Sequence, residues 1–163
     1  GGAAYLEWLM ATVQPLIEKQ FRVARGREAT GIAGASMSGL ISLYAFGRFP
    51  QRFRLVGGMS PSLYFGEEAL TRWLSHRPPA GGRVYLDIGT LEGRRNRRRR
   101  TAPKSPSGAM RRLRRLRRGF EKAGYRRGVD LEWIEEPGGR HDEAAWARRL
   151  PGMLDFLFRP RSG

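Results

Sequence analysis

Ser36 is the residue of this chain whose setting best suits covalent chemistry. It lies in the stretch TGIAGASMSGLISLYAF, residues 30–46, where a short apolar strand turns into an apolar helix that begins at Met37. A serine at such a turn projects its hydroxyl away from the backbone, beside the unpaired N–H groups of the helix start. The pattern approaches the nucleophile-elbow motif Gly-x-Ser-x-Gly, with Gly34 in the first glycine position and Ser38 in the second. The same residues also suit an ordinary glycine- and serine-rich turn, so other residues must decide.

A serine hydroxyl needs a general base, and the chain has only two histidines to offer. His76 ends a polar helix just before Arg-Pro-Pro, and we expect it to be a plain surface residue. His141 follows a glycine turn and directly precedes the last helix. His141 is therefore the candidate base.

A carboxylate must hold the imidazole and stabilise its charged form. Glu92 is the best-placed candidate, because it follows the strand RVYLDIG in a short loop. Asp87 is the alternative acid, although its place inside that strand favours a backbone or loop partner instead. The order Ser36, acid, His141 is also the chain order of the α/β-hydrolases.

The hydrophobic pattern predicts an α/β fold, with about four parallel strands flanked by helices. The expected strands cover 31–33, 53–60, 83–89 and 129–135, and the expected helices cover 5–21, 37–49, 67–76, 109–123 and a final helix that Asp142 caps. In the first helix the apolar face would consist of Leu6, Leu9, Val13, Leu16 and Ile17, with Pro15 kinking or restarting it. Gly57 and Gly58 suggest the close approach of another backbone. The carboxyl ends of parallel strands share one edge, where Ser36, Glu92 and His141 would meet.

Length and composition indicate one folded domain over residues 1–163 and leave the compartment open. The chain has no cysteine, which excludes disulfides and thiolate metal sites, and the chemistry above requires no metal or organic cofactor. No apolar run approaches the roughly 18 residues of a membrane span. The sequence starts without Met, which leaves its native start and any targeting signal open. The cytoplasm is the default expectation, and the oligomeric state is unassigned.

The net charge of +16 comes mostly from one segment, since residues 94–118 hold 13 basic residues and no acidic one. We interpret residues 94–108 as a basic, flexible insertion. The alternative is a basic module that binds nucleic acid or an anionic membrane through phosphates. Little aromatic interleaving is present for base stacking, so nucleic acid is an unlikely partner.

Several stretches together resemble the putative esterase family, which includes enterochelin esterase-like and esterase D-like α/β-hydrolases, with the mycolyltransferases as distant relatives. They are YLEWLMATVQPLIEKQFRV, GIAGASMSGLISLYAFGRFPQRF, VYLDIGTLEG and GGRHDEAAWARRLPGMLDFLF. The resemblance implies a hydrolase of small carboxylic esters that works through an acyl-enzyme. Ser36 corresponds to the nucleophile, Glu92 to the acid, His141 to the base, and the Met37 N–H to an oxyanion-hole donor.

Two departures from the family pattern qualify this expectation. Ser38 stands where the family usually has glycine, and its side chain would tighten the turn or crowd a substrate. The strands that precede the elbow strand in the family have almost no counterpart here. We therefore expect the C-terminal part of an α/β-hydrolase fold, with the elbow strand as an exposed sheet edge. An impaired, truncated remnant and an acyltransferase of the same family are the alternatives.

Overall fold

The computed structural model of the chain describes residues 1–93 and 107–160. Its centre is a four-stranded parallel sheet in the order β1 (Gly31–Ala35), β2 (Leu55–Met59), β3 (Arg83–Gly89) and β4 (Leu131–Glu136). The strand order follows the chain order, as right-handed crossovers through helices allow. The predicted α/β class and the four parallel strands are confirmed.

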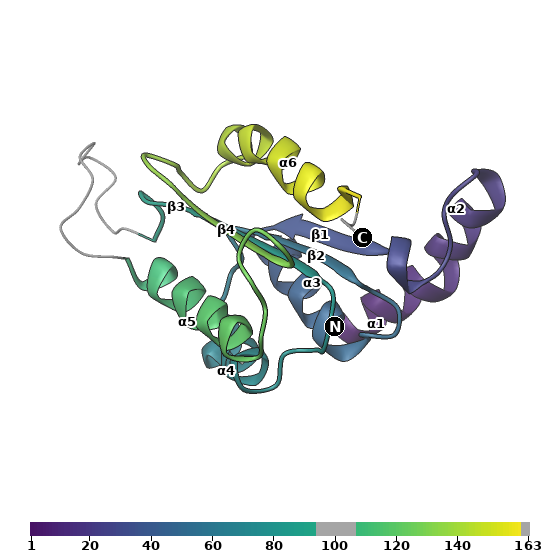
Figure 1. Cartoon of the computed structure of the whole chain (residues 1–163), viewed down its shortest axis with the longest axis horizontal. Coiled ribbons are helices and arrows are strands. Elements are labelled where there is room, and N and C mark those ends of the chain that lie inside the picture. The colour runs from purple at the N-terminus through teal and green to yellow at the C-terminus, as the bar shows by residue number, and fades with distance from the viewer. Residues whose placement is uncertain (94–106, 161–163) are drawn as a thin grey trace.

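Helices cover both faces of this sheet (Figure 1). On one face lie α3 (Met37–Arg48), α4 (Ala69–His76), which a short 3₁₀ turn η3 (Phe65–Glu68) precedes, and α5 (Gly108–Lys122). On the other face lies α6 (Glu143–Phe158), which the side chain of Asp142 caps by accepting the N–H of Ala145 at 2.9 Å. The segment 94–106, most of the predicted flexible insertion, lies outside the described residues.

Each face of the sheet has its own hydrophobic core, and β3 supplies both by alternation. Val84, Leu86 and Ile88 pack with α3, α4 and α5, and all three are buried. Tyr85 points to the other face, where it packs with residues of α6 such as Met153. Asp87 lies one step further along on that same face, and this places a carboxylate beneath α6 at the carboxyl end of the sheet.

The sheet has one open edge, because β1 pairs with β2 alone within the described residues. β1 is only partly buried, whereas all five residues of β2 are buried. The expectation that the elbow strand forms an exposed edge is therefore confirmed for this part of the chain.

The N-terminal helix differs from its prediction. It consists of α1 (Gly2–Trp8), a π-helical turn η1 (Leu9–Val13) and α2 (Gln14–Gln20), and Pro15 lies in the first turn of α2 as a restart. Leu6 is buried against α3, but Leu16 and Ile17 are 51% and 42% exposed. The predicted apolar face is therefore wrong in its second half, because α2 extends past the sheet (Figure 1), packs mainly against the adjoining η1 and buries none of its residues.

The glycines of β2 lie close to side chains, whereas the sequence predicted another backbone beside them. A Cβ on Gly57 would lie 2.3 Å from the Met153 sulfur, and one on Gly58 would lie 3.1 Å from a methyl carbon of Leu43. The close approach is thus made by side chains of α6 and α3, not by another backbone.

No helix in the described part of the chain combines the length and the apolar character that crossing a bilayer requires.

Candidate active site

The turn between β1 and α3 holds Ser36 in an unusual backbone conformation. Its φ of 56° and ψ of −119° lie in a region that residues other than glycine rarely adopt. Three backbone hydrogen bonds hold it there: its N–H donates to Met59 at 3.0 Å, and its carbonyl accepts from Leu40 at 3.1 Å and from Ser62 at 3.0 Å. The loop after β2 therefore stabilises the strained turn at the end of β1.

Gly34 is required by the tightness of this turn. A Cβ at Gly34 would lie 2.6 Å from the Cβ of Ser38 and 2.7 Å from its carbonyl carbon. Ser38 itself is exposed, and it lines a mostly apolar hollow with Met37 and Phe65. The structure thus accommodates serine in the second glycine position.

Ser36, His141 and Glu92 lie in one hydrogen-bonded row at the carboxyl edge of the sheet. The Oγ of Ser36 lies 2.9 Å from Nε2 of His141, and Nδ1 of His141 lies 2.8 Å from Oε2 of Glu92. The geometry suits the tautomer in which Nδ1–H donates to the carboxylate and Nε2 accepts from the serine hydroxyl. The juxtaposition predicted from strand order is present.

A second hydroxyl lies beside the first. The Oγ of Ser62, a residue only 4% exposed, lies 3.2 Å from the Oγ of Ser36. In the tautomer just described, the single proton of the Ser36 hydroxyl is directed at the imidazole, so Ser62 is the donor in this pair. That donation would stabilise negative charge on the Ser36 oxygen.

Glu92 is almost completely buried and is held from its far side. Its Oε1 accepts from the N–H of Gly89 at 2.7 Å and from the Ser60 hydroxyl at 2.6 Å, which leaves Oε2 for His141. Oε1 therefore fixes the position of the carboxylate, and Oε2 orients the imidazole.

Ser60 links this support to α6. Its hydroxyl donates to Glu92 and accepts from the indole N–H of Trp146 at 3.1 Å and from Nη2 of Arg149 at 2.9 Å. The Trp146 ring also meets the His141 ring edge-on, with centroids 5.1 Å apart. Trp146 thus packs against the imidazole.

Arg149 is the buried cation of this region, with a side chain only 4% exposed. Its guanidinium lies 3.3 Å from Asp87, 3.7 Å from Glu92 and 3.0 Å from Glu136. Without it, two buried carboxylates would face each other across Ser60 with no compensating charge.

Asp87 is not placed to act as the acid that orients His141. Its Oδ1 accepts the N–H of Ser60 at 3.0 Å, and its other oxygen faces Arg149. Burial raises the pKa of Asp87 from 3.8 to about 6, against the lowering effect of the Arg149 guanidinium. Asp87 thus contacts a backbone N–H and the Arg149 guanidinium, and Glu92 is the carboxylate that contacts the imidazole.

A cleft of about 320 Å³ opens beside the row. Ser62 and His141, both hydrogen-bonded to Ser36, line it together with Leu63, Ile88 and Arg112. Met37, the first residue of α3, directly follows Ser36, and its N–H has no acceptor within the helix because of that position. Across the described residues no group of three or more His, Asp or Glu side chains is arranged to hold a metal ion.

Sequence reasoning missed Ser60, Ser62 and Arg149. Arg149 left a signal, because it interrupts the otherwise apolar buried positions Ala145, Met153 and Phe156 of α6. The two serines left only the short string Ser-Pro-Ser after an apolar strand, which by itself is typical of any loop.

Comparison with known proteins agrees with this architecture. Residues 1–157 match the family model described as "Putative esterase". The protein YbbA of Bacillus subtilis, described as uncharacterized, is 37% identical over 93 residues, which are 57% of this chain and 37% of YbbA.

Similar folds occur among solved structures. One is the enterobactin esterase FES from Shigella flexneri, crystallised with 2,3-dihydroxy-N-benzoyl-serine (TM-score 0.72, 25% identity, 93% of this chain and 37% of that one). A ferulic acid esterase has a TM-score of 0.71 at 19% identity and covers 95% of this chain and 60% of its own. The chain thus spans little more than a third of YbbA and of the Shigella enzyme. The family model covers nearly all of this chain, and its sheet is of the α/β-hydrolase type: the chain belongs to the putative esterase family.

Proposed function

We propose that this chain carries the catalytic row of a serine hydrolase that cleaves small carboxylic esters through an acyl-enzyme. The observation that carries the proposal is the row itself: Ser36 Oγ, the two ring nitrogens of His141 and Glu92 Oε2 are joined by contacts of 2.9 and 2.8 Å. These are the distances at which a base can take the serine proton while a carboxylate holds the base.

In the first half-reaction the Ser36 oxygen attacks the ester carbonyl carbon, and its proton moves to Nε2 of His141. Glu92 stabilises the imidazolium through Nδ1–H. Nε2 then returns the proton to the leaving alcohol as the carbon–oxygen bond breaks, which leaves the acyl group on Ser36. In the second half His141 takes a proton from water as the water oxygen attacks the acyl carbon. Nε2 then returns that proton to the Ser36 oxygen as its bond to the acyl carbon breaks, which releases the carboxylic acid and restores the Ser36 hydroxyl.

The N–H of Met37 is the proposed donor to the oxyanion that forms in each half. Removing one of two such donors costs about 10²–10³ in rate in a well-studied protease. A contact from the Met37 N–H would therefore be worth a rate factor of about this size.

Hydrolysis is favoured over acyl transfer by the exposure of the base. The side chain of His141 is 43% exposed, so the imidazole ring is open to water. An acyltransferase would be expected to shield this position from water. The enzymes of known structure named above are described as acting on enterobactin and ferulic acid; for this chain we propose only the class they share, a small-molecule ester.

The test is steady-state hydrolysis of p-nitrophenyl acetate by the wild type, Ser36→Ala and Ser38→Ala. The two serines lie in the same turn, so each variant removes one hydroxyl from a similar setting. We expect Ser36→Ala to lower kcat at least about 10³-fold and Ser38→Ala to change it less than about threefold. Equal rates for the two variants would contradict the proposal.

A further inference from the structure

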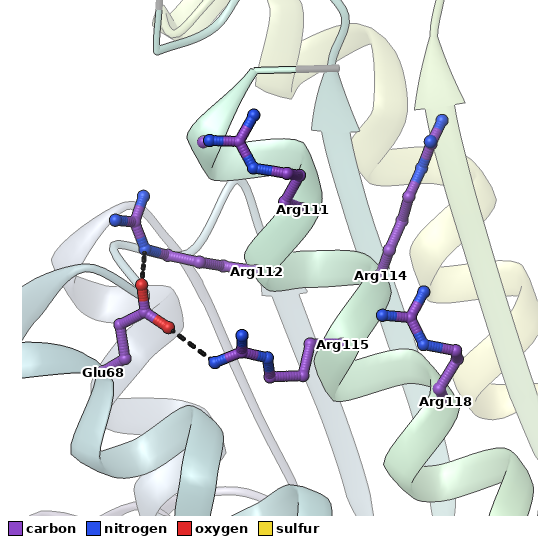
Figure 2. A pocket seen from close by; sticks show the side chains of 7 residues that line it. Glu68, Arg111, Arg112, Arg114, Arg115 and Arg118 are labelled. Carbon is purple, nitrogen blue, oxygen red and sulfur yellow. Dashed lines mark hydrogen bonds and ion pairs between the residues drawn. The ribbon is translucent and has the colours of Figure 1, made fainter. Parts of the chain in front are cut away.

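The exposed face of α5 forms a second hollow, of about 330 Å³, whose chemistry the ester reaction does not use (Figure 2). Its lining side chains are Arg111, Arg112, Arg114, Arg115 and Arg118, together with Glu68 from the turn before α4. Five arginines and one carboxylate thus line the hollow, and only Arg112 and Arg115 contact that carboxylate. A concave site so rich in guanidinium is suited to anions with several oxygen atoms.

The ion pairs within this arginine pocket use only part of its charge. Nε of Arg112 lies 2.6 Å from one oxygen of Glu68, and Nη1 of Arg115 lies 3.0 Å from the other (Figure 2). Arg114 binds Glu135 of β4 through both Nε and Nη2, at 2.6 and 2.5 Å. Arg118 is exposed and makes no ion pair with a carboxylate of the described residues.

The start of α5 adds to the positive potential. Gly108, its first residue, also lines the pocket, and the first turn of the helix contains no acidic residue. The N-terminal end of a helix carries partial positive charge and unpaired N–H groups. The helix end and the arginines therefore favour the same kind of ligand.

The shape of the site favours a small ligand over a nucleic acid. The arginines enclose a hollow, and no aromatic side chain lines it for base stacking. The nearby ring of Trp133 is covered by Arg117 and Arg127, whose guanidinium carbons lie 4.2 and 4.6 Å from the ring centroid.

We propose that the arginine pocket binds a compact, multiply charged phosphate group, carried either by a soluble metabolite or by a lipid headgroup. Arg115, Arg118 and the start of α5 would contact the phosphate oxygens. The pocket adjoins the ester cleft through Gly108 and Arg112, which line both. Ligand binding to the arginine pocket is measured directly, so the result does not depend on whether the chain hydrolyses esters.

The experiment is isothermal titration of the whole chain with tripolyphosphate, at low and at physiological salt. We expect saturable binding of one ligand per chain that weakens as salt rises. The variant Arg115→Gln/Arg118→Gln should weaken binding at least about tenfold, because each loses a charge-assisted hydrogen bond. The control Arg22→Gln/Arg52→Gln removes the same charge from exposed positions outside the pocket and should change binding less than about twofold. Equal weakening by both variants would show diffuse attraction and overturn the proposal.

A variant with the opposite expected effect guards against simple loss of folding. Glu68→Gln removes the carboxylate that competes for Arg112 and Arg115, and we expect it to tighten tripolyphosphate binding roughly threefold or more. Unchanged or weaker binding by a folded Glu68→Gln variant, judged by circular dichroism, would count against the pocket.

Two further arms identify the source of the phosphate. Binding to phosphatidylcholine vesicles that contain phosphatidylinositol 4-phosphate, with displacement by tripolyphosphate, would support the pocket and assign a lipid headgroup. Tripolyphosphate binding without vesicle binding would support it and assign a soluble ligand. Binding to duplex DNA that tripolyphosphate does not displace, with no saturable tripolyphosphate site, would overturn it.

Discussion

Replacing Arg149 with methionine tests whether the buried guanidinium stabilises the support of the row formed by Ser36, His141 and Glu92. Methionine keeps most of the side-chain length and removes the charge. The structure places Asp87 at 3.3 Å, Glu92 at 3.7 Å and Glu136 at 3.0 Å from this guanidinium. The side chains of Asp87 and Glu92 are 0% and 3% exposed, so neither carboxylate can turn to water when its partner is removed.

The expected loss at neutral pH is large. Removing one partner of a buried ion pair costs about 3–5 kcal/mol, because the remaining charge stays buried without compensation. The hydrogen bond from Arg149 to Ser60, at 2.9 Å, is lost as well. We therefore expect the free energy of unfolding to fall by about 3–5 kcal/mol.

The loss should depend on pH with a defined sign. Burial already raises the pKa of Asp87 to about 6, and loss of the Arg149 charge raises it further. A carboxyl whose folded-state pKa lies above its unfolded value is protonated more readily in the folded chain. The penalty in Arg149→Met is therefore largest above that pKa, and it shrinks as pH falls through it.

The assay is urea unfolding followed by circular dichroism, with Arg148→Met as the matched control. Arg148 is the adjacent residue and also pairs with Glu136, at 3.2 Å, but its side chain is 59% exposed. We expect Arg148→Met to cost less than about 1 kcal/mol. Losses of equal size in the two variants, or a loss below about 1 kcal/mol for Arg149→Met, would refute the reasoning.

Three other predictions follow from the same geometry. Glu92→Gln keeps the shape but removes the charge that holds the imidazolium, so we expect kcat for p-nitrophenyl acetate to fall roughly 10²–10⁴-fold, and a fall below threefold would exclude the role. Gly34→Ala places a Cβ 2.7 Å from the Ser38 carbonyl carbon, so we expect the free energy of unfolding in urea to fall by at least about 2 kcal/mol. Adding Ser38→Gly should not restore this stability, because the clash with the backbone remains. Full restoration by the double variant would contradict this reasoning. For Asp87, with a pKa raised from 3.8 to about 6, the neutral carboxyl contributes stability that is full below the unfolded pKa and is lost as pH rises through about 6. Asp87→Asn should remove about 2–3 kcal/mol of this pH dependence, and an unfolding free energy that keeps the wild-type slope would argue against it.

The convergence of Ser36, Glu92 and His141 could be predicted because it depends mainly on strand order. Each residue follows the carboxyl end of a parallel strand, and such ends share one edge whatever the details of packing. The choice of Glu92 over Asp87 also followed from local structure, since a residue inside a strand has its side chain fixed to one face of the sheet.

The support beneath the row could not be predicted in the same way. Ser60 and Arg149 are 89 residues apart, and their contact at 2.9 Å depends on how α6 lies across the sheet. The exposure of α2 was missed for a related reason, since its apolar residues Leu16 and Ile17 follow the helical spacing although α2 extends past the sheet. Long-range packing decides both features, and periodicity reports only local structure.

The most direct test of the catalytic claim is to find which serine reacts. The chain is treated with a fluorophosphonate probe, digested, and the modified peptide is sequenced by mass spectrometry. Ser62 lies 3.2 Å from Ser36 and is the internal competitor, but only Ser36 has its oxygen at 2.9 Å from Nε2 of His141. We predict that the adduct is on Ser36 and that His141→Ala abolishes it. An adduct on Ser62, or labelling that survives His141→Ala, would contradict the account.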